Sequence, residues 1–245
     1  MTYLVAEAGT GHAGDNPAER FHRAGALIAA AASTGFDAVK FQLFVPDEPL
    51  FCPLPGDDAR WTRWNRTLIS LDNWMMLQDA KIDVLWSAFQ PTGVEWLKAL
   101  MPRYIKVASR AAHCYPYGLF DPPFIVSTGL FGGSAIPAHA FKLKCITEYP
   151  APLEKSGWDA NYNGLSDHSG TIYPGLDAIA HDAKFLEVHF RLPFQEKSPD
   201  DPASLSLEDL KTLSKARDAF ARMHPGGRGR SRIGGTADIR RVAAD

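Results

Sequence analysis

Residues 3–44 read YLVAEAGTGHAGDNPAERFHRAGALIAAAASTGFDAVKFQLF and contain a complete strand–helix–strand unit. The apolar run of residues 3–9 predicts a strand. Residues 17–35 predict a helix, because a proline stands near the first turn and a glycine at the end. A second apolar run, residues 37–44, follows at once. A helix between two such runs is typical of a parallel sheet.

The same alternation continues along the chain. Further strands are predicted at residues 83–89, 103–109, 123–129, 141–149, 161–168 and 185–192, with amphipathic helices at 71–81, 92–101, 173–183 and 206–223. Eight strands in about 190 residues fit an α/β fold, the closed (β/α)₈ TIM barrel, with an open doubly wound sheet as the alternative. The Gly- and Pro-rich connections 113–122 and 130–140 predict shortened or missing outer helices there.

Composition and charge exclude several classes of protein. The chain of 245 residues has a formal net charge of −2, which does not favour nucleic acid or an anionic membrane as a partner. It has no apolar run near the roughly 20 residues of a membrane span, and its N-terminus does not resemble a signal peptide. The three cysteines have no C-x-x-C spacing and are predicted to be free thiols in a reducing cytoplasm: Cys52, Cys114 and Cys145.

The chain is expected to form one catalytic barrel, residues 1–223, followed by a Gly- and Arg-rich C-terminal tail, residues 224–245. The tail lacks a pattern that could form a core, so it is predicted to be either a solvated arm or an arm that binds a partner.

Gly9, Gly11 and Gly14 spell G-x-G-x-x-G directly after the first strand, which is the spacing of a dinucleotide-binding turn. The context disagrees with that hypothesis. The helix is predicted to start near Pro17, beyond the last glycine. Asp37 precedes the second strand, whereas the ribose-binding acid of a dinucleotide site stands at the C-terminal end of that strand. The glycines are therefore interpreted as the hinge of a rim loop.

Polar residues interrupt nearly every predicted strand close to its C-terminal end, which is the rim where TIM barrels build active sites. Each one alone could be structural, but their recurrence indicates a site. Two lysines with several hydroxyls suit a phosphorylated anion, and two histidines at neighbouring strand ends suit a divalent metal ion. The rim residues are Glu7, Lys40, Gln42, Ser87, Lys106, Ser109, Ser127, Thr147, Tyr149, Ser166, His168 and His189.

Several motifs, in order, resemble those of the N-acetylneuraminate (sialic acid) synthase family, which condenses phosphoenolpyruvate with sugars to give 3-deoxy sugar acids. The segments that carry the resemblance are AEAGTGHAGD, DAVKFQLF, YIKVAS, IVSTG, CITEYPAP, GLSDHSGT, LEVHFRLP and SPDDPASLSLEDL.

This resemblance implies a role for each site residue. The residues expected to bind phosphoenolpyruvate are Lys40, Ser87, Lys106, Ser109, Ser127, Thr147 and Ser166. His168 and His189 are the expected ligands of a divalent metal cofactor, Mn²⁺ or Mg²⁺. Catalytic or acceptor-binding roles are expected for Glu7, His12, Gln42, Tyr149 and Asp200.

The implied reaction joins phosphoenolpyruvate to the aldehyde of a sugar, N-acetylmannosamine-like or another aldose, and releases a 2-keto-3-deoxy acid and phosphate by C–O cleavage. Two motif positions depart from the family: Ala111 replaces a Glu and Gly11 replaces an Asn. The chain also ends at Asp245, about where relatives begin a C-terminal antifreeze-like domain, so the acceptor half of the site looks rebuilt.

Family analogy further suggests a homodimer. One hypothesis is that a tail arginine reaches the site of a partner subunit, the candidates being Arg228, Arg230, Arg232, Arg240 and Arg241. Two other functions stay open, a lyase or isomerase on the same scaffold and a non-catalytic ligand-binding barrel.

Overall fold

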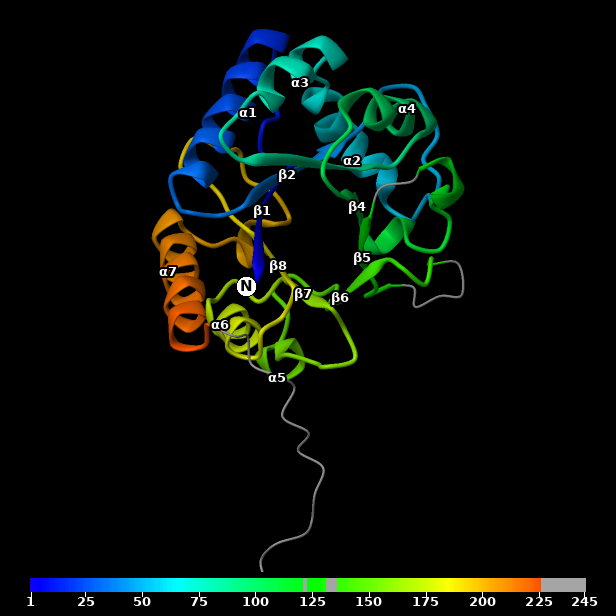
Figure 1. Cartoon of the computed structure of the whole chain (residues 1–245). Helices are drawn as coiled ribbons and strands as arrows, with labels where there is room; N and C mark the ends of the chain where they lie inside the picture. The colour runs from blue at the N-terminus through cyan, green and yellow to red at the C-terminus, as the bar shows by residue number, and fades with distance from the viewer. Residues whose placement is uncertain (121–122, 131–135, 226–245) are drawn as a thin grey trace, which may run out of the picture.

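The computed structural model describes residues 1–120, 123–130 and 136–225. Parallel strands run through the centre of the molecule and helices surround them (Figure 1). Each strand lies within one of the predicted runs, so the predicted TIM barrel is confirmed. The strands are β1 (Tyr3–Gly9), β2 (Ala38–Leu43), β3 (Asp83–Ala88), β4 (Ile105–Val107), β5 (Phe124–Ser127), β6 (Phe141–Cys145), β7 (Gly164–Asp167) and β8 (Phe185–His189).

The strand order distinguishes a barrel from an open sheet. The order is β3-β2-β1-β8-β7-β6-β5-β4, so the first strand pairs with the last. In the register, Glu7 of β1 lies opposite both Lys40 of β2 and His189 of β8. β3 and β4 also lie side by side, although the described residues form no hydrogen-bonded ladder between them. An open doubly wound sheet would not join its first and last strands.

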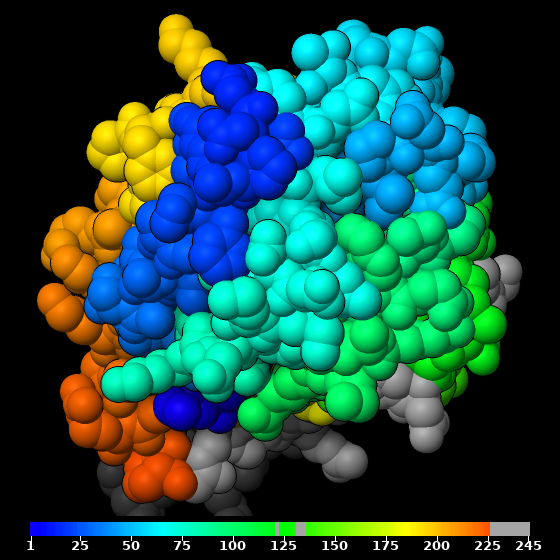
Figure 2. All heavy atoms as spheres, turned by 90° about the horizontal axis from the view of Figure 1, so that it is seen from above, coloured from blue at the N-terminus to red at the C-terminus, as the bar shows by residue number. Residues whose placement is uncertain are grey.

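Five helices appear where helical patterns were predicted: α1 (Pro17–Ala32), α3 (Leu71–Gln78), α4 (Pro91–Leu100), α6 (Tyr173–Ala180) and α7 (Leu207–Met223). The side chain of Asn16 caps α1 by accepting from the amide of Glu19. Ser206 and Asp209 form a capping box on α7. α1 and α7 pack side by side on the outside of the barrel (Figures 1 and 2).

Two stretches differ from a regular barrel. After β2 the chain forms α2 (Asp57–Trp64) and η1 (Asn65–Thr67), which the sequence analysis did not predict. After β4 and β6, the described residues form only η2 (Ser109–Ala111), η3 (Tyr117–Leu119) and α5 (Leu153–Ser156), while η4 (Asp201–Ala203) precedes α7. The predicted loss of outer helices is therefore confirmed for residues 113–120, and the second such connection lies partly outside the described residues.

Side chains alternate between the two faces of the strands. The outward set, including Leu4, Val39 and Trp86, packs against residues of the helices such as Leu27 and Leu97. The inward set begins with apolar groups at the N-terminal end of the barrel: Tyr3, Val5, Ala38, Leu85, Tyr104, Ile125, Phe141, Leu143 and Phe185. These groups close the bottom of the barrel, which leaves the C-terminal ends of the strands for a site.

Cys52 and Cys114 form a disulfide, and Cys145 is a buried free cysteine. The prediction that all three are unpaired thiols is therefore wrong. Cys52 follows β2 and Cys114 follows β4, and the two loops converge so that the Cα atoms lie 6.5 Å apart across 62 residues of sequence. Such convergence leaves no local spacing signal. The exposed His113 lies beside the pair, with its Nε2 3.8 Å from the Sγ of Cys52.

No helix in the described part of the chain is long and apolar enough to span a membrane. α7 ends at Met223, and the domain boundary at that residue stays a prediction. The predicted tail lies almost wholly outside the described residues, since the description stops at residue 225, and its arginines stay a prediction.

Candidate active site

The period of two along the strands places the predicted polar residues on the inner face, one layer above the apolar plug. They open into a pocket of about 640 Å³ at the C-terminal ends of the strands. Residues from the site predictions that line it are Glu7, Lys40, Gln42, Lys106, Ser109, Ser127, Thr147, Tyr149, Ser166, His168, His189 and Asp200. The fold therefore brings together twelve residues that are far apart in sequence.

Two buried lysines dominate the floor of the pocket. The Nζ of Lys40 lies 2.7 Å from the Oε2 of Glu7, and the Nζ of Lys106 lies 3.4 Å from the Oε1 of Glu187. Lys106 also donates to the Oγ of Ser127 at 2.9 Å. Burial lowers the pKa of Lys40 to about 8, against the opposing charge of Glu187. Each ammonium group thus has a carboxylate beside it to compensate for its burial.

Glu187 is the buried carboxylate that links this floor together. It accepts a hydrogen bond from the Oγ of Ser166 at 2.8 Å. Burial alone raises the pKa of a carboxyl group, but the charges of Lys106 and Lys40 lower the pKa of Glu187 to about 2. Its Oε2 is buried without a hydrogen-bond partner among the described residues. This oxygen is available to a bound water molecule or ligand.

His168 and His189 meet at the rim, with ring centroids 5.1 Å apart. Burial lowers the pKa of both imidazoles to about 3, so both are neutral at physiological pH. The Nδ1 of His168 faces the carbonyl oxygen of Ile146, which only accepts, so Nδ1 carries the hydrogen and Nε2 presents its lone pair. The Nδ1 of His189 lies 4.0 Å from the Oδ2 of Asp200. Two neutral imidazoles beside a carboxylate fit a divalent metal ion.

Tyr149 and Gln42 complete the rim. The hydroxyl of Tyr149 lies 3.1 Å from the Nε2 of His168, and desolvation raises its pKa well above the usual value, although 40% of the residue is exposed. The Nε2 of Gln42 donates to the Oε1 of Glu7 at 3.4 Å. Tyr149 is therefore a protonated donor at neutral pH, and Gln42 orients the Glu7 carboxylate.

His12 and Ser87 lie away from the pocket surface. His12 is fully buried, with its Nε2 2.9 Å from the carbonyl oxygen of Thr67 and its ring edge-on to Phe41 and Trp74. The structure therefore does not place its side chain in the pocket lining, and its catalytic role stays a prediction. Ser87 lies behind Lys40, at 3.4 Å from its Nζ, so it reaches the pocket only through that lysine.

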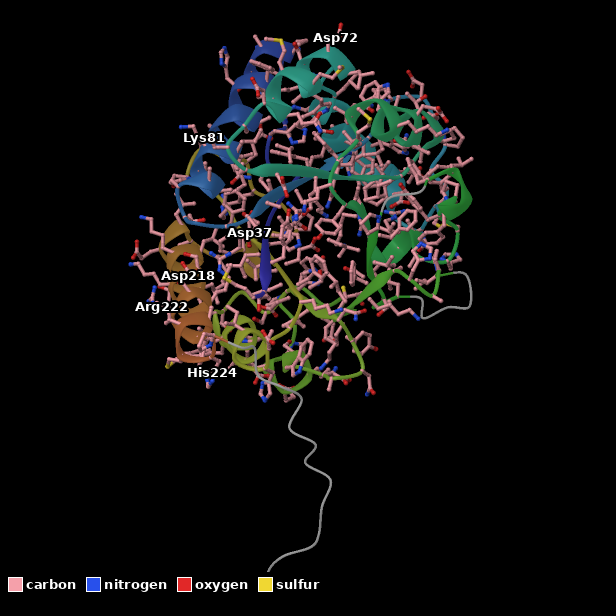
Figure 3. The ribbon with its side chains drawn as sticks, in the orientation of Figure 1. Asp37, Asp72, Lys81, Asp218, Arg222 and His224 are labelled. Atoms are coloured by element: carbon pink, nitrogen blue, oxygen red, sulfur yellow. A yellow bond between two sulfur atoms is a disulfide. The ribbon has the colours of Figure 1, made fainter. Side chains whose placement is uncertain are left out.

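The glycine motif serves the site rather than a nucleotide. α1 begins at Pro17, beyond Gly14, as predicted. Asp37 lies at the N-terminal start of β2 next to α7 (Figure 3), where its Oδ2 accepts from the amide of Leu4 at 2.8 Å and pairs with Arg217. Gly9 has a φ of +55°, and an added Cβ would lie 3.2 Å from the Oδ2 of Asp200.

Comparison with known proteins gives the family. Residues 27–227 match the NeuB family. This chain is a member of the NeuB family. It is 27% identical to N,N'-diacetyllegionaminic acid synthase of Campylobacter jejuni over 86% of this chain and 74% of that protein. It is 26% identical to the spore coat polysaccharide biosynthesis protein SpsE of Bacillus subtilis over 86% of this chain and 65% of that protein.

The fold of a solved relative agrees. The structure of N-acetylneuraminic acid synthetase from Leptospira borgpetersenii superposes with a TM-score of 0.73 at 20% identity, covering 92% of this chain and 86% of that chain. Other relatives are named pseudaminic acid synthase and N-acetylneuraminate-9-phosphate synthase, and together with the NeuB match they confirm the expected family resemblance.

Two features of the pocket of this NeuB barrel were not predicted from the sequence: one buried carboxylate and a set of arginines. Glu187 was missed, although it precedes His189 by two positions and therefore shares its inward face. The other group is the wall formed by α2 and η2, with Arg60, Arg63 and Arg110. The segment DDARWTRW is short and mostly polar, and its apolar face consists of little more than Trp61 and Trp64, so it was not predicted as a helix.

Proposed function

We propose that this chain is a metal-dependent synthase that condenses phosphoenolpyruvate with the aldehyde of a sugar and releases phosphate by C–O cleavage. The observation that carries the proposal is the buried, carboxylate-paired lysines Lys40 and Lys106 beneath two neutral imidazoles in one pocket. A buried cation that opens onto a pocket favours a multiply charged anion as ligand.

Phosphoenolpyruvate would contribute a carboxylate and a phosphate to this floor. Lys106 and the hydroxyl of Ser127 already lie within 2.9 Å of each other and can donate together to one phosphate oxygen. Hydroxyl groups of Ser109, Ser166 and Thr147 line the same pocket. These donors are fixed before the reaction, so they can stabilise the charge of the departing phosphate without reorganising.

His168 and His189 would hold the metal ion, Mn²⁺ or Mg²⁺, with Asp200 beside them. When bound, such an ion supplies Lewis acidity that polarises the sugar aldehyde. Tyr149 would then orient the acceptor, because its protonated hydroxyl is at the same rim.

In the condensation, C3 of phosphoenolpyruvate forms a bond to the aldehyde carbon, and the aldehyde oxygen takes up a proton. Water adds at C2 and loses a proton to a base, and the C2–O bond to phosphate then breaks. Glu7 is the candidate for that base, since Lys40 and Gln42 fix its carboxylate in the pocket. The product is a 2-keto-3-deoxy acid three carbons longer than the sugar.

The test is release of phosphate from phosphoenolpyruvate in the presence of a panel of aldoses, with and without Mn²⁺. We expect release that needs both the aldose and the metal ion. Lys106→Met should lower kcat/KM for phosphoenolpyruvate by about 100-fold, as loss of a charged hydrogen bond predicts. Lys98→Met is the matched control, because Lys98 is half-exposed on α4 and pairs only with Glu95. A cytoplasmic location and a homodimer stay predictions.

A further inference from the structure

One part of the pocket wall carries three arginines. Arg60 and Arg63 lie one turn apart on α2, and Arg110 of η2 joins them along the same pocket. Together they are called the arginine wall below. The reaction proposed above uses none of these residues.

Arg63 is held in place by neutral oxygens. Its Nε donates to the Oγ1 of Thr10 at 2.7 Å, its Nη2 to the carbonyl oxygen of Thr10 at 3.3 Å, and its Nη1 to that of Lys197 at 3.3 Å. All three of these acceptors are uncharged. Burial lowers the pKa of Arg63, and more distant carboxylates, Asp200 foremost, oppose that change. Arg63 therefore has no direct ion pair with a carboxylate among the described residues.

Asp57 is shared between the other two arginines. The guanidinium of Arg110 binds both of its oxygens, at 3.0 and 2.5 Å, while Arg60 lies 3.6 Å from one of them. The amide of Leu54 also donates to Asp57 at 2.8 Å. One carboxylate therefore serves two guanidinium groups, and the more exposed Arg60 keeps free N–H donors.

Three stacked aromatic side chains contribute to the lining of the same pocket. The ring of Phe44 stacks on Trp64 at 4.3 Å and on Phe89 at 4.7 Å, and all three line the pocket. Arg110 lies over Trp64, 5.7 Å from its ring centroid. These stacked rings therefore help to hold Arg110 in place.

The wall is also close to the reaction centre. Arg60 and Arg63 line the same pocket as Tyr149, His168 and Asp200. An acceptor with its aldehyde near Tyr149 and the histidines can therefore direct its far end to α2.

We propose that the acceptor of this enzyme is an aldose that carries an anionic group, a phosphate ester or a carboxylate, and that Arg60 and Arg63 bind that group. The inference rests on the proposed function and deepens it. Arginine suits this task because its planar fork matches the oxygens of phosphate and carboxylate. Arg110 has a positioning role, since Asp57 already occupies its donors.

The test compares matched acceptors with phosphoenolpyruvate and Mn²⁺. The pairs are arabinose with arabinose 5-phosphate and N-acetylmannosamine with its 6-phosphate, and glucuronate provides the carboxylate arm. We expect an anionic acceptor to exceed its neutral partner in kcat/KM by at least about tenfold. Arg60→Gln should remove about tenfold of that advantage and leave both the KM for phosphoenolpyruvate and the neutral acceptor unchanged. Arg103→Gln is the control, because Arg103 is exposed beside Tyr3 and Tyr104 at the bottom of the barrel.

The outcomes separate this inference from the proposed function. If neutral and anionic acceptors react equally, or if Arg60→Gln raises the KM for phosphoenolpyruvate instead, the inference fails while the synthase survives. If no acceptor releases phosphate, the proposed function fails, and calorimetric titration of the sugar phosphates into the phosphoenolpyruvate-loaded protein decides the rest. Binding that Arg60→Gln weakens about tenfold would then support the arginine subsite. Absence of binding, or binding unchanged by Arg60→Gln, would overturn it.

Discussion

Lys40 and Glu7 form a buried ion pair, 2.7 Å from Nζ to Oε2, across the neighbouring strands β1 and β2. Their side chains are 4% and 1% exposed. Because both charges are buried, the same ion pair affects the folding stability of the barrel and the geometry of the site. Removing one partner strands the other in a place that water does not reach.

Lys40→Met should therefore lower the free energy of unfolding by about 3–5 kcal/mol, since Glu7 is left buried and unpaired. The double variant Lys40→Met with Glu7→Leu should recover much of that loss, because it removes both charges. Urea denaturation of the two variants and the parent protein measures the difference. Equal losses in the single and double variants would show that the pairing contributes nothing.

Gly9 is expected to be the glycine of the motif that activity needs. Gly9→Ala puts a side chain at a φ of +55°, which costs roughly 1–2 kcal/mol, and pushes its Cβ against the carboxylate of Asp200. Turnover should fall together with stability. Gly118→Ala is the matched control, since nothing lies within 4 Å of an added Cβ there. Steady-state rates and thermal unfolding check both, and a fully active Gly9→Ala would contradict the close approach.

His12 should make stability depend on pH. Burial lowers its pKa from 6.5 to about 4, so the unfolded chain takes up a proton that the folded chain refuses. The stabilisation is fully present above pH 6.5 and is lost as the pH falls toward 4. Between pH 7.5 and 5 the linkage amounts to about 2 kcal/mol.

Urea unfolding at both pH values measures that dependence. His12→Asn should remove about 2 kcal/mol of the change, whereas His22→Asn, on the exposed side of α1, should leave it intact. An unaltered pH profile in His12→Asn would mean that the imidazole is not buried as described.

The barrel and its polar floor could be predicted from the sequence because both follow local periodicity. Apolar runs fixed the strands, and the same period of two placed Lys40, Lys106, Ser127 and Ser166 on one face. The C-terminal rim then followed from the parallel direction of the strands. His12 is a histidine like His168 and His189, so its residue type does not show whether it faces the pocket. The orientation of its ring depends on Phe41 and Trp74, which lie beside it only in the folded protein.

Features made by converging loops could not be predicted. α2 begins after Gly56 without a side-chain cap, and its eight residues offer only the short apolar face of Trp61 and Trp64, so its helical signal is weak. The disulfide between Cys52 and Cys114 forms because the loop after β2 meets the loop after β4 in the folded protein.

The disulfide predicts a definite thiol count. Denatured but unreduced protein should react with one equivalent of a thiol reagent, at Cys145, and reduced protein with three, because Cys52 and Cys114 are paired. Cys52→Ser should lower the free energy of unfolding by roughly 2–5 kcal/mol, the range for closing such a loop. Three reactive thiols before reduction would show that all three cysteines are free, as predicted from the sequence.

Turnover of phosphoenolpyruvate labelled with heavy oxygen between C2 and phosphorus tests whether the C2–O bond breaks. With Mn²⁺ and a reactive aldose, we expect one phosphate per keto acid, with the label carried away in the phosphate. Phosphate without the label, or no phosphate with any neutral or anionic aldose, would contradict it.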